Sequence, residues 1–302
     1  MSKLSTALIL LKTNRNGLLI SVMENLYFLF PDKLYLQLLY RLKLGRKPDL
    51  KDPQRFTEKL QWLKLYNRKP EYTVMVDKYA VKGYVARIIG DEHIIPTLGV
   101  WDRPEDIDFD GLPDQFVLKT THGGGGTGVV ICKDKSIFNR KEAIRELKRS
   151  MKANIYGKLR EWPYKNVQKR VIAEKYMGDG DGQLRDYKFF CFNGEPRAML
   201  VASNRYTTHN FDYFDMDFNH LPIVSVAGEP LGDKLEKPVS FDEMKIMVAA
   251  LSKGLPHVRV DLYSTKENIY FGELTFFDSS GFDNMTSDMW DLKFGSWLEI
   301  NT

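Results

Sequence analysis

The chain has 302 residues, of which 43% are hydrophobic and 28% are charged, and its formal net charge is +4. This length suffices for about two domains, and the composition excludes disordered and fibrous classes of protein. No apolar run approaches the roughly 18 residues of a membrane span, and two cysteines are too few for a disulfide framework. We therefore expect a cytoplasmic protein in which Cys132 and Cys191, both in apolar runs, are buried free thiols.

The charge is distributed unevenly along the chain. Residues 1–90 carry 17 Lys and Arg against 7 Asp and Glu, whereas residues 91–302 carry 27 and 33. Two interpretations stay open for the basic first third. It could face an anionic partner, such as an acidic glycan, nucleic acid or the phospholipid of the inner membrane face, or it could be a solvated helical surface. We expect no nucleic-acid partner, because no recognition module is visible. A zinc enzyme is disfavoured, because the five histidines show no ligand spacing.

Three helices are predicted, two in the first part of the chain and one near residue 240. Asp52 and Pro53 are typical of an N-cap and a first helical turn, and apolar residues follow at helical spacing at Phe56, Leu60 and Leu63. A second helix is predicted to start near residue 77 and to end at residue 90, with a core face formed by Val81, Val85 and Ile88. A third is predicted after a capping-box pattern at Ser240 and Glu243, and Gly254 would end it.

Strands dominate the sequence after residue 90. β-branched and aromatic runs bounded by turn residues predict strands at 115–120, 127–132, 171–176, 187–193, 198–203, 257–263 and 269–275. Short turns between them favour antiparallel pairing. The predicted fold class is therefore α+β with largely antiparallel sheets.

A glycine-rich stretch follows the first of these strands. Glycines allow the backbone to approach phosphate oxygens closely and to donate its N–H groups. The P-loop pattern fails, because Val129 stands where it needs Lys, and a Rossmann loop would open a helix rather than a strand. The protein-kinase catalytic motifs are missing as well. The stretch is therefore predicted to be the tip of a β-hairpin, either a phosphate lid or simply a flexible turn.

Two carboxylates are predicted to face each other near the C-terminus. Strand alternation places Arg259 and Asp261 on one face, and a short link returns the chain so that Glu273 lies opposite or diagonal to Asp261. Such a pair repels by roughly 3–4 kcal/mol at an effective dielectric near 20. A magnesium ion between oxygen ligands would relieve this repulsion. Arg259 alone, as a structural salt bridge, is the alternative.

These motifs, in this order, resemble those of the ATP-grasp ligases. Arg259 and Asp261, followed by Glu273 and Thr275, resemble the metal-binding end of that superfamily. More specifically, the segments at 56–64, 95–96, 186–189 and 270–276 resemble the TupA-like ATP-grasp family, named for teichuronopeptide biosynthesis. The chain departs from the usual pattern in two ways. Thr275 stands where Asn is usual, and basic helices replace the parallel-sheet domain that usually precedes the grasp.

The resemblance implies an ATP-grasp fold, in which two α+β subdomains clamp ATP, after an N-terminal helical region. Its boundaries would be 1–75 for the basic helices and 76–302 for the ATP-grasp domain, with a lid and hinge at about 113–180 and a metal-binding part at 181–302. It further implies ATP and Mg²⁺ as cofactors and Arg259 and Lys188 as catalytic residues. The metal ligands would be Asp261, Glu273 and Thr275. The residues implied at ATP are Lys78, Lys119, Gly124, Gly125, Gly126, Thr127, Glu174, Lys175, Tyr176 and Met177.

The implied activity is that of an ATP-dependent carboxylate–amine ligase. Such an enzyme forms an amide through an acyl phosphate, here on a carboxylate-bearing surface polysaccharide or its precursor, with an amino acid or amine as the second substrate. Three alternatives stay open: a glycosyltransferase using Asp215 and Asp217 as an Asp-x-Asp motif within an irregular aromatic stretch, an ATP-dependent sugar kinase, and a non-catalytic binding module.

Overall fold

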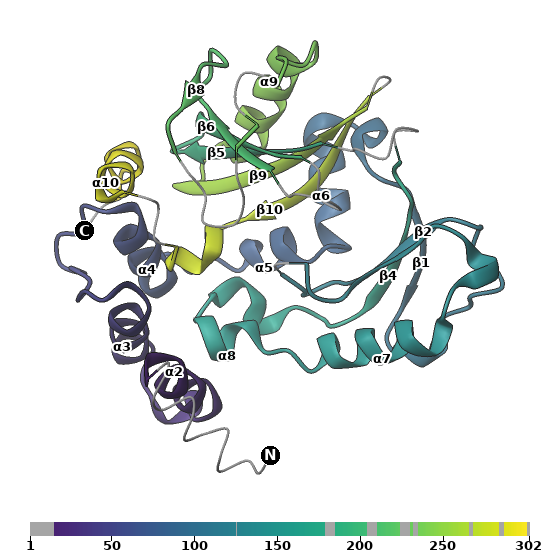
Figure 1. Cartoon of the computed structure of the whole chain (residues 1–302), viewed down its shortest axis with the longest axis horizontal. Helices are drawn as coiled ribbons and strands as arrows, with labels where there is room; N and C mark the ends of the chain where they lie inside the picture. Colours follow the sequence, from purple (N-terminus) through teal and green to yellow (C-terminus); the bar gives the residue numbers. More distant parts are fainter. Residues whose placement is uncertain are drawn as a thin grey trace.

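The computed structural model describes residues 15–124, 126–178, 185–203, 210–223, 230–231, 235–265, 268–283 and 287–300. Two antiparallel β-sheets dominate this part of the chain, and helices cover them (Figure 1). The α+β class with antiparallel sheets, predicted from the sequence, is confirmed. Cys132 and Cys191 are buried free thiols, also as predicted.

The smaller sheet has four strands in the order β1-β4-β2-β3, with every pair antiparallel. Its strands are β1 (Thr97–Trp101), β2 (Phe116–Thr120), β3 (Val129–Cys132) and β4 (Val171–Lys175). Helix α7 (Arg140–Met151) covers one face, where Ala143 and Leu147 pack against Phe116 and Leu118. Figure 1 shows α7 and the short α8 (Ile155–Leu159) along the edge of this unit.

The larger sheet has six strands in the order β10-β9-β5-β6-β7-β8. They are β5 (Asp186–Phe192), β6 (Glu195–Ser203), β7 (Asn210–Phe214), β8 (His220–Leu221), β9 (His257–Ser264) and β10 (Ile269–Thr275). Helix α9 (Phe241–Ser252) packs on one face through Phe241, Met244 and Val248, all fully buried. The main hydrophobic core lies between this sheet and the helices beside it.

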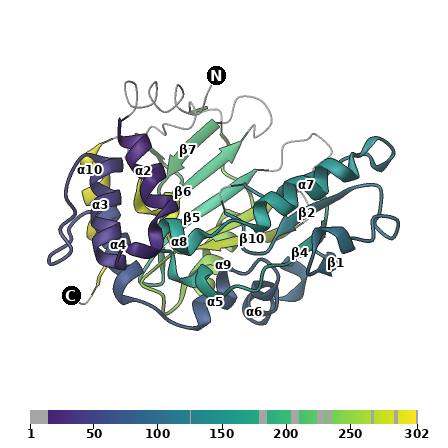
Figure 2. The same ribbon diagram turned by 90° about the horizontal axis from the view of Figure 1, so that it is seen from below.

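The remaining helices form a group at the other end of the molecule. Figure 2 shows α2 (Arg15–Asn25), α3 (Asp32–Leu44), α4 (Phe56–Tyr66) and α10 (Asp288–Trp297) side by side, with α5 (Glu71–Val76) and α6 (Ala80–Ile89) closer to the sheets. The helical region that precedes the sheets therefore meets the C-terminal helix α10 through α4. Lys59 of α4 bonds the carbonyl oxygens of Gly295 and Leu298, which ties α4 to α10.

Several local predictions are wrong, for physical reasons that the structure shows. Asp52 and Pro53 do not start a helix. Helix α4 starts at Phe56, and its Glu58 carboxylate accepts from the backbone N–H groups just before it. The Ser240 hydroxyl makes no cap bond, because it pairs with the Ser264 hydroxyl at 2.9 Å. Ile88 is 37% exposed rather than buried. The aromatic stretch predicted to be irregular contains strand β7.

Candidate active site

The two predicted carboxylates occupy paired positions on adjacent strands. Asp261 on β9 lies opposite Glu273 on β10, and Arg259 lies opposite Thr275, with a bulge between residues 271 and 273. Arg259 shares a face with Asp261, and its Nε is 2.7 Å from Asp261 Oδ1. The predicted pairing and face are therefore confirmed.

Three cations from three different elements meet this carboxylate pair. Lys188 is paired in register with Asp261 across β5 and β9, and its Nζ lies 2.5 Å from Asp261 Oδ2. Lys78, just before α6, donates to Glu273 Oε2 at 2.8 Å. Arg259 Nη2 lies 3.2 Å from Glu273 Oε1 and also donates to the Thr275 hydroxyl. We call these residues the carboxylate–cation cluster: Lys78, Lys188, Arg259, Asp261 and Glu273.

The opposite charges of the cluster stabilise one another. Burial alone would raise the pKa of Glu273, but the charges of Lys78 and Arg259 outweigh it and hold that pKa well below its ordinary value. Burial would lower the pKa of Lys188, yet Asp261 and Asp186 raise it. Both shifts favour the charged form, of Glu273 in the first case and of Lys188 in the second. Arg259 contributes to the neutralisation, but Lys78 and Lys188 share it.

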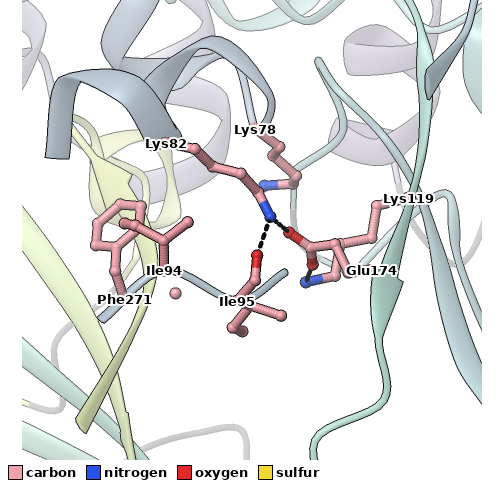
Figure 3. A pocket seen from close by; sticks show the side chains of 8 residues that line it. Lys78, Lys82, Ile94, Ile95, Lys119, Glu174 and Phe271 are labelled. Carbon is pink, nitrogen blue, oxygen red and sulfur yellow. Dashed lines mark hydrogen bonds and ion pairs between the residues drawn. The ribbon is translucent and has the colours of Figure 1, made fainter. Parts of the chain in front are cut away.

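A second group of charges lies on the smaller sheet, around Glu174. Figure 3 shows Lys82 of α6 and Lys119 of β2 both pointing to the Glu174 carboxylate of β4, at 2.5 and 2.6 Å. Burial would raise the pKa of Glu174, but the two lysines hold it below its ordinary value. These residues line one pocket together with Lys78, Ile95 and Phe271. One wall of the pocket is therefore basic and suits phosphate, and the other wall, with Ile95 and Phe271, is apolar.

The start of α6 is held against the smaller sheet. Asp77 Oδ1 accepts from the backbone N–H groups of Tyr79 and Ala80, which caps the helix. The other carboxylate oxygen of Asp77 bonds Arg170 at 3.0 Å, and the Lys78 N–H donates to the Thr121 carbonyl. These contacts fix Lys78 at the junction of the two sheets.

The glycine-rich stretch is the turn of the β2–β3 hairpin, as predicted. Gly126 and Gly128 have φ of +77° and +72°, a left-handed region that favours glycine. The Thr127 N–H and hydroxyl both bond the Gly124 carbonyl, at 3.2 and 2.7 Å. Gly125 lies outside the described residues. The turn stands directly beside Lys119, the second last residue of β2.

Residues 174–177, which the family resemblance implies at ATP, differ in their surroundings. The backbone N–H of Lys175 is bonded to the Pro96 carbonyl at 3.0 Å, so it is not free for a ligand. The side chain of Glu174 points to the two lysines. Tyr176 and Met177 are half-buried directly after β4. Among residues 174–177, Glu174 is therefore the one whose side chain contacts the lysines.

Sequence reasoning missed three charged residues of this region. Lys82 lies four residues after Lys78, which was a usable spacing signal. Asp186 lies two residues before Lys188 on the same strand face, and their charged atoms are 2.6 Å apart. Asp278 contacts Arg259 Nη1 from the turn after β10. No spacing pattern predicts that last contact.

Asp215, proposed in the Asp-x-Asp alternative, has a structural role. Its Oδ1 accepts from the backbone N–H groups of Asp217 and Asn219, at 2.9 and 2.8 Å, and its Oδ2 accepts from the Asn219 side chain. These bonds stabilise the tight turn between β7 and β8. These hydrogen bonds explain why an aspartate stands at position 215, so a metal–nucleotide ligand is not needed to explain it.

The comparison with protein families identifies the family of this chain. The model of the TupA-like ATPgrasp family matches residues 58–299. The chain belongs to the TupA-like ATP-grasp family. The match contains both sheets and every residue of the carboxylate–cation cluster, and it confirms the resemblance found in the sequence.

Solved structures with a related fold are distant. The D-alanine–D-alanine ligase from Bacillus anthracis matches at a TM-score of 0.41 and 19% identity over 67% of this chain and 57% of that chain. The one from Helicobacter pylori matches at 0.44 and 13% over 82% and 70%, and the ATP-grasp ligase PsnB complexed with minimal precursor at 0.38 and 12% over 72% and 59%. Such TM-scores add nothing to the family assignment. No curated protein sequence matches the chain.

The described part of this TupA-like ATP-grasp protein contains no helix long and apolar enough to cross a membrane. It also contains no group of three or more His, Cys, Asp or Glu side chains placed for a metal ion. The oxygen donors at this place are Asp261 and Glu273 of the cluster and the neighbouring Thr275 hydroxyl, which lies 3.3 Å from Glu273 Oε1. Hard oxygen donors of this kind fit Mg²⁺, which usually keeps several waters and few protein ligands.

Proposed function

We propose that this protein is an ATP-dependent carboxylate–amine ligase. One observation carries the proposal: Lys78, Lys188 and Arg259 converge on the paired carboxylates Asp261 and Glu273, beside a glycine hairpin. Phosphoryl transfer needs neutralisation of charge and alignment more than an acid–base pair. The cluster places positively and negatively charged side chains within hydrogen-bond distance of one another.

The nucleotide would lie between the two sheets. Its phosphates would take Lys78 and Lys119 away from their carboxylate partners, and the backbone of the hairpin at Gly124, Gly126 and Thr127 would cover them. Gly125 is part of the same proposed lid. The segment 174–177 would border the adenine, with Ile95 and Phe271 as nearby apolar surface.

Asp261 and Glu273 would hold Mg²⁺, with Thr275 as a weaker third donor. When bound, the ion neutralises charge on the phosphates. Lys188 and Arg259, both largely buried, are held by Asp261 at a fixed place on the sheet. They would donate to the transferring phosphoryl group and to the acyl phosphate.

The reaction has two balanced steps. A carboxylate oxygen of the first substrate attacks the γ-phosphorus, the bond to the β-phosphate oxygen breaks, and ADP leaves. The nitrogen of an amine then attacks the acyl carbon, a C–N bond forms, the C–O bond to phosphate breaks, and inorganic phosphate and a proton leave.

The family association points to a uronic acid or similar carboxylate on a surface polysaccharide or its precursor, and to an amino acid or amine as its partner. A contact with the inner membrane face is part of the proposal. Apolar side chains on and after α2 are exposed, namely Leu19 (46%), Val22 (48%), Phe28 (68%) and Leu29 (63%). Together with the basic first third, this composition suits an anionic lipid surface. Co-sedimentation with phosphatidylglycerol vesicles tests it, and Phe28→Ser should reduce binding.

A screen for ADP release tests the ligase proposal directly. Uronic acids would be offered against amino acids and amines with MgATP, and the products would be weighed by mass spectrometry. An amide mass supports the ligase, and a phosphoester mass supports a sugar kinase. Nucleotide binding without any product would favour the non-catalytic module.

A further inference from the structure

The segment 56–64, which resembles the family, contributes no residue to the carboxylate–cation cluster, yet it contains a fully buried lysine. Lysine is almost never fully buried unless its charge has partners. Lys64 Nζ donates to the carbonyl oxygens of Leu159 and Ser280 at 2.9 and 2.7 Å and to the Ser280 hydroxyl at 2.7 Å. An ammonium group has three N–H donors, so these three oxygens match its charged form. The Glu161 carboxylate, which bonds the same hydroxyl, supplies the nearby opposite charge.

The oxygens of Ser280 belong to a turn with an unusual backbone. This turn, Asp278–Gly281, follows β10 and lies beside α4 (Figure 1). Ser279 and Ser280 have φ of +46° and +55°, a left-handed region that residues other than glycine seldom adopt, and Gly281 follows at +64°. Two consecutive left-handed serines are unfavourable on their own, so contacts from the rest of the fold must hold them.

Helix α4 supplies those contacts. Gln61 Nε2, about one helical turn before Lys64, donates to the carbonyl oxygens of Ser280 and Gly281 at 3.2 and 2.9 Å. The Lys64 ammonium also lies over the ring of Phe282, 4.5 Å from its centre, and an aromatic face attracts a cation. The two side chains of α4 therefore hold the turn through its backbone oxygens and through the residue that follows it.

The first residue of this turn bonds the arginine of the cluster. Nε and Nη2 of Arg259 bond residues of β9 and β10, whereas Nη1 bonds Asp278 Oδ1. Because a guanidinium group is planar and its donors have fixed directions, the bond at Nη1 helps to set the orientation of the whole group. The place of the turn therefore determines how one side of the Arg259 guanidinium is held.

We propose that Lys64 and Gln61 are positioning residues, which hold the left-handed turn so that Asp278 fixes Arg259 in the cluster. Their role in the reaction rests on the proposed ligase function. Both act through Asp278, and the serines of the turn adopt their unfavourable backbone because α4 stabilises it. Helix α4 thereby connects the N-terminal helical region to the larger sheet at the residue proposed to stabilise the transferring phosphoryl group.

Hydrogen exchange at pH 6 tests the turn without any turnover, and Lys64 is charged there because burial lowers its pKa only to about 7. The backbone N–H groups of Ser280 and Phe282 bond the carbonyls of residues 277 and 279 and report on the turn, with the β9 amides as reference for unfolding of the sheet. Lys64→Met should reduce their protection by at least about 10-fold, the factor for one hydrogen bond to a charged group. The matched control is Lys59→Met, because Lys59 of the same helix bonds carbonyls at α10. It should leave the turn amides as protected as in the unaltered protein.

A second measurement follows Arg259 itself. In NMR spectra, the Arg259 Nη1 protons, identified by their loss in Arg259→Lys, should be protected from exchange in the unaltered protein and in Lys59→Met. They should exchange faster in Lys64→Met and, as a positive control, in Asp278→Ala. Adding Ser279→Gly to Lys64→Met removes backbone strain at an exposed position and should restore part of the protection. A lysine that merely stabilised the fold would show no such rescue.

The outcomes are distinct. Turn amides and Nη1 protons that stay as protected in Lys64→Met as in the unaltered protein, or that Lys59→Met affects equally, overturn the positioning role. If Lys64→Met fails to fold by circular dichroism, Gln61→Met decides by the same two measurements.

The ligase proposal has its own test, which is ADP release by the unaltered protein. Absence of product there counts against the ligase function, whereas hydrogen exchange still decides whether α4 holds the turn and Arg259. Where ADP is released, Lys64→Met should lower kcat by about 10-fold and leave the ATP dissociation constant nearly unchanged. An equal fall in ATP affinity would contradict a positioning role through Arg259.

Discussion

Asp261 and Glu273 lie directly opposite each other on β9 and β10, and Arg259, two residues from Asp261, bonds both carboxylates. Two like charges at paired positions would destabilise a sheet. The structure avoids this cost by bringing Lys78 and Lys188 to the same place from a helix start and a third strand. The site therefore depends on charge balance.

The first prediction concerns the carboxylates. If these carboxylates hold the metal as proposed, Asp261→Asn and Glu273→Gln should each lower turnover by at least about 100-fold, because a charge needed at the metal site is lost. Asp261 is 2% exposed and bonds Lys188 and Arg259. Its removal leaves buried cations with fewer partners, so the unfolding free energy of the metal-free protein should fall by about 3–5 kcal/mol. Glu273 is 35% exposed and its loss should cost less.

Urea denaturation and ADP release, measured on the same preparations, check this prediction. A metal-free Asp261→Asn protein as stable as the parent would show that mutual repulsion dominates the cluster. Full turnover in either variant would remove both carboxylates from the proposed metal site.

The second prediction concerns Arg259. Arg259→Lys keeps the charge but loses the planar, two-pronged donor geometry that reaches Asp261, Glu273 and Asp278. We expect a loss of about 2–4 kcal/mol in transition-state stabilisation and little change in the ATP dissociation constant. Steady-state ADP release and calorimetry on one variant give both numbers. If ATP affinity falls as far as turnover, Arg259 serves in ground-state binding or as a structural ion-pair partner.

The third prediction concerns Lys119. Lys119→Ala should weaken MgATP binding by about 10-fold to 100-fold, because one charge-assisted hydrogen bond to the phosphates is lost. Lys148→Ala is the matched control, since Lys148 is a half-exposed lysine of α7 that pairs with Glu105. Calorimetric titration with MgATP measures both. Unchanged affinity in a folded Lys119→Ala protein would place the nucleotide elsewhere.

The fourth prediction concerns pH. Burial lowers the pKa of His257 to about 3, whereas an unfolded chain has a histidine pKa near 6.5. Below pH 6.5 the unfolded state takes up a proton that the folded state does not, so this stability is present above pH 6.5 and is lost as pH falls towards 3. At pH 5 the loss from His257 should be about 2 kcal/mol.

Replacing His257 tests that account. His257→Gln can still donate to the Cys191 carbonyl, which the imidazole bonds at 2.9 Å, but it cannot titrate. The difference in unfolding free energy between pH 7.5 and pH 5 should therefore shrink by about 2 kcal/mol, measured by urea denaturation at both values. An unchanged difference would assign the acid sensitivity to other groups.

The strands that carry the site could be predicted from the sequence, because alternation of apolar residues and turn residues are local signals. It placed Asp261 and Glu273 on one face by parity, and the observed register agrees. It missed β1, where Gly99 interrupts the apolar pattern, and β7, whose aromatic residues lack clear alternation. The wrong cap at Ser240 has a tertiary cause, since the Ser264 hydroxyl competes for it.

The parts of the site that depend on three-dimensional placement were not predictable from spacing. Asp278 meets Arg259 through the path of a turn. The spacing of Lys82 from Lys78 was a usable signal for that lysine, but it does not predict Glu174 as its partner. The sequence analysis placed Glu174 at ATP because of the strand on which it lies. It did not predict that the Glu174 side chain forms ion pairs with two lysines. Local patterns thus identify which strand bears a charge, but not which distant residue neutralises it.

Lys78 and Lys82 lie one helical turn apart, yet they bond different sheets: Lys78 reaches Glu273 of the larger sheet, and Lys82 reaches Glu174 of the smaller one. Together these two ion pairs link the two sheets to each other. The triphosphate that we propose as ligand would have to replace these internal counter-ions, so its arrival would weaken the link between the sheets and restore the same charges around the ligand. Ionic strength should consequently change the dimensions of the free protein more than those of the nucleotide complex, a difference within reach of small-angle X-ray scattering.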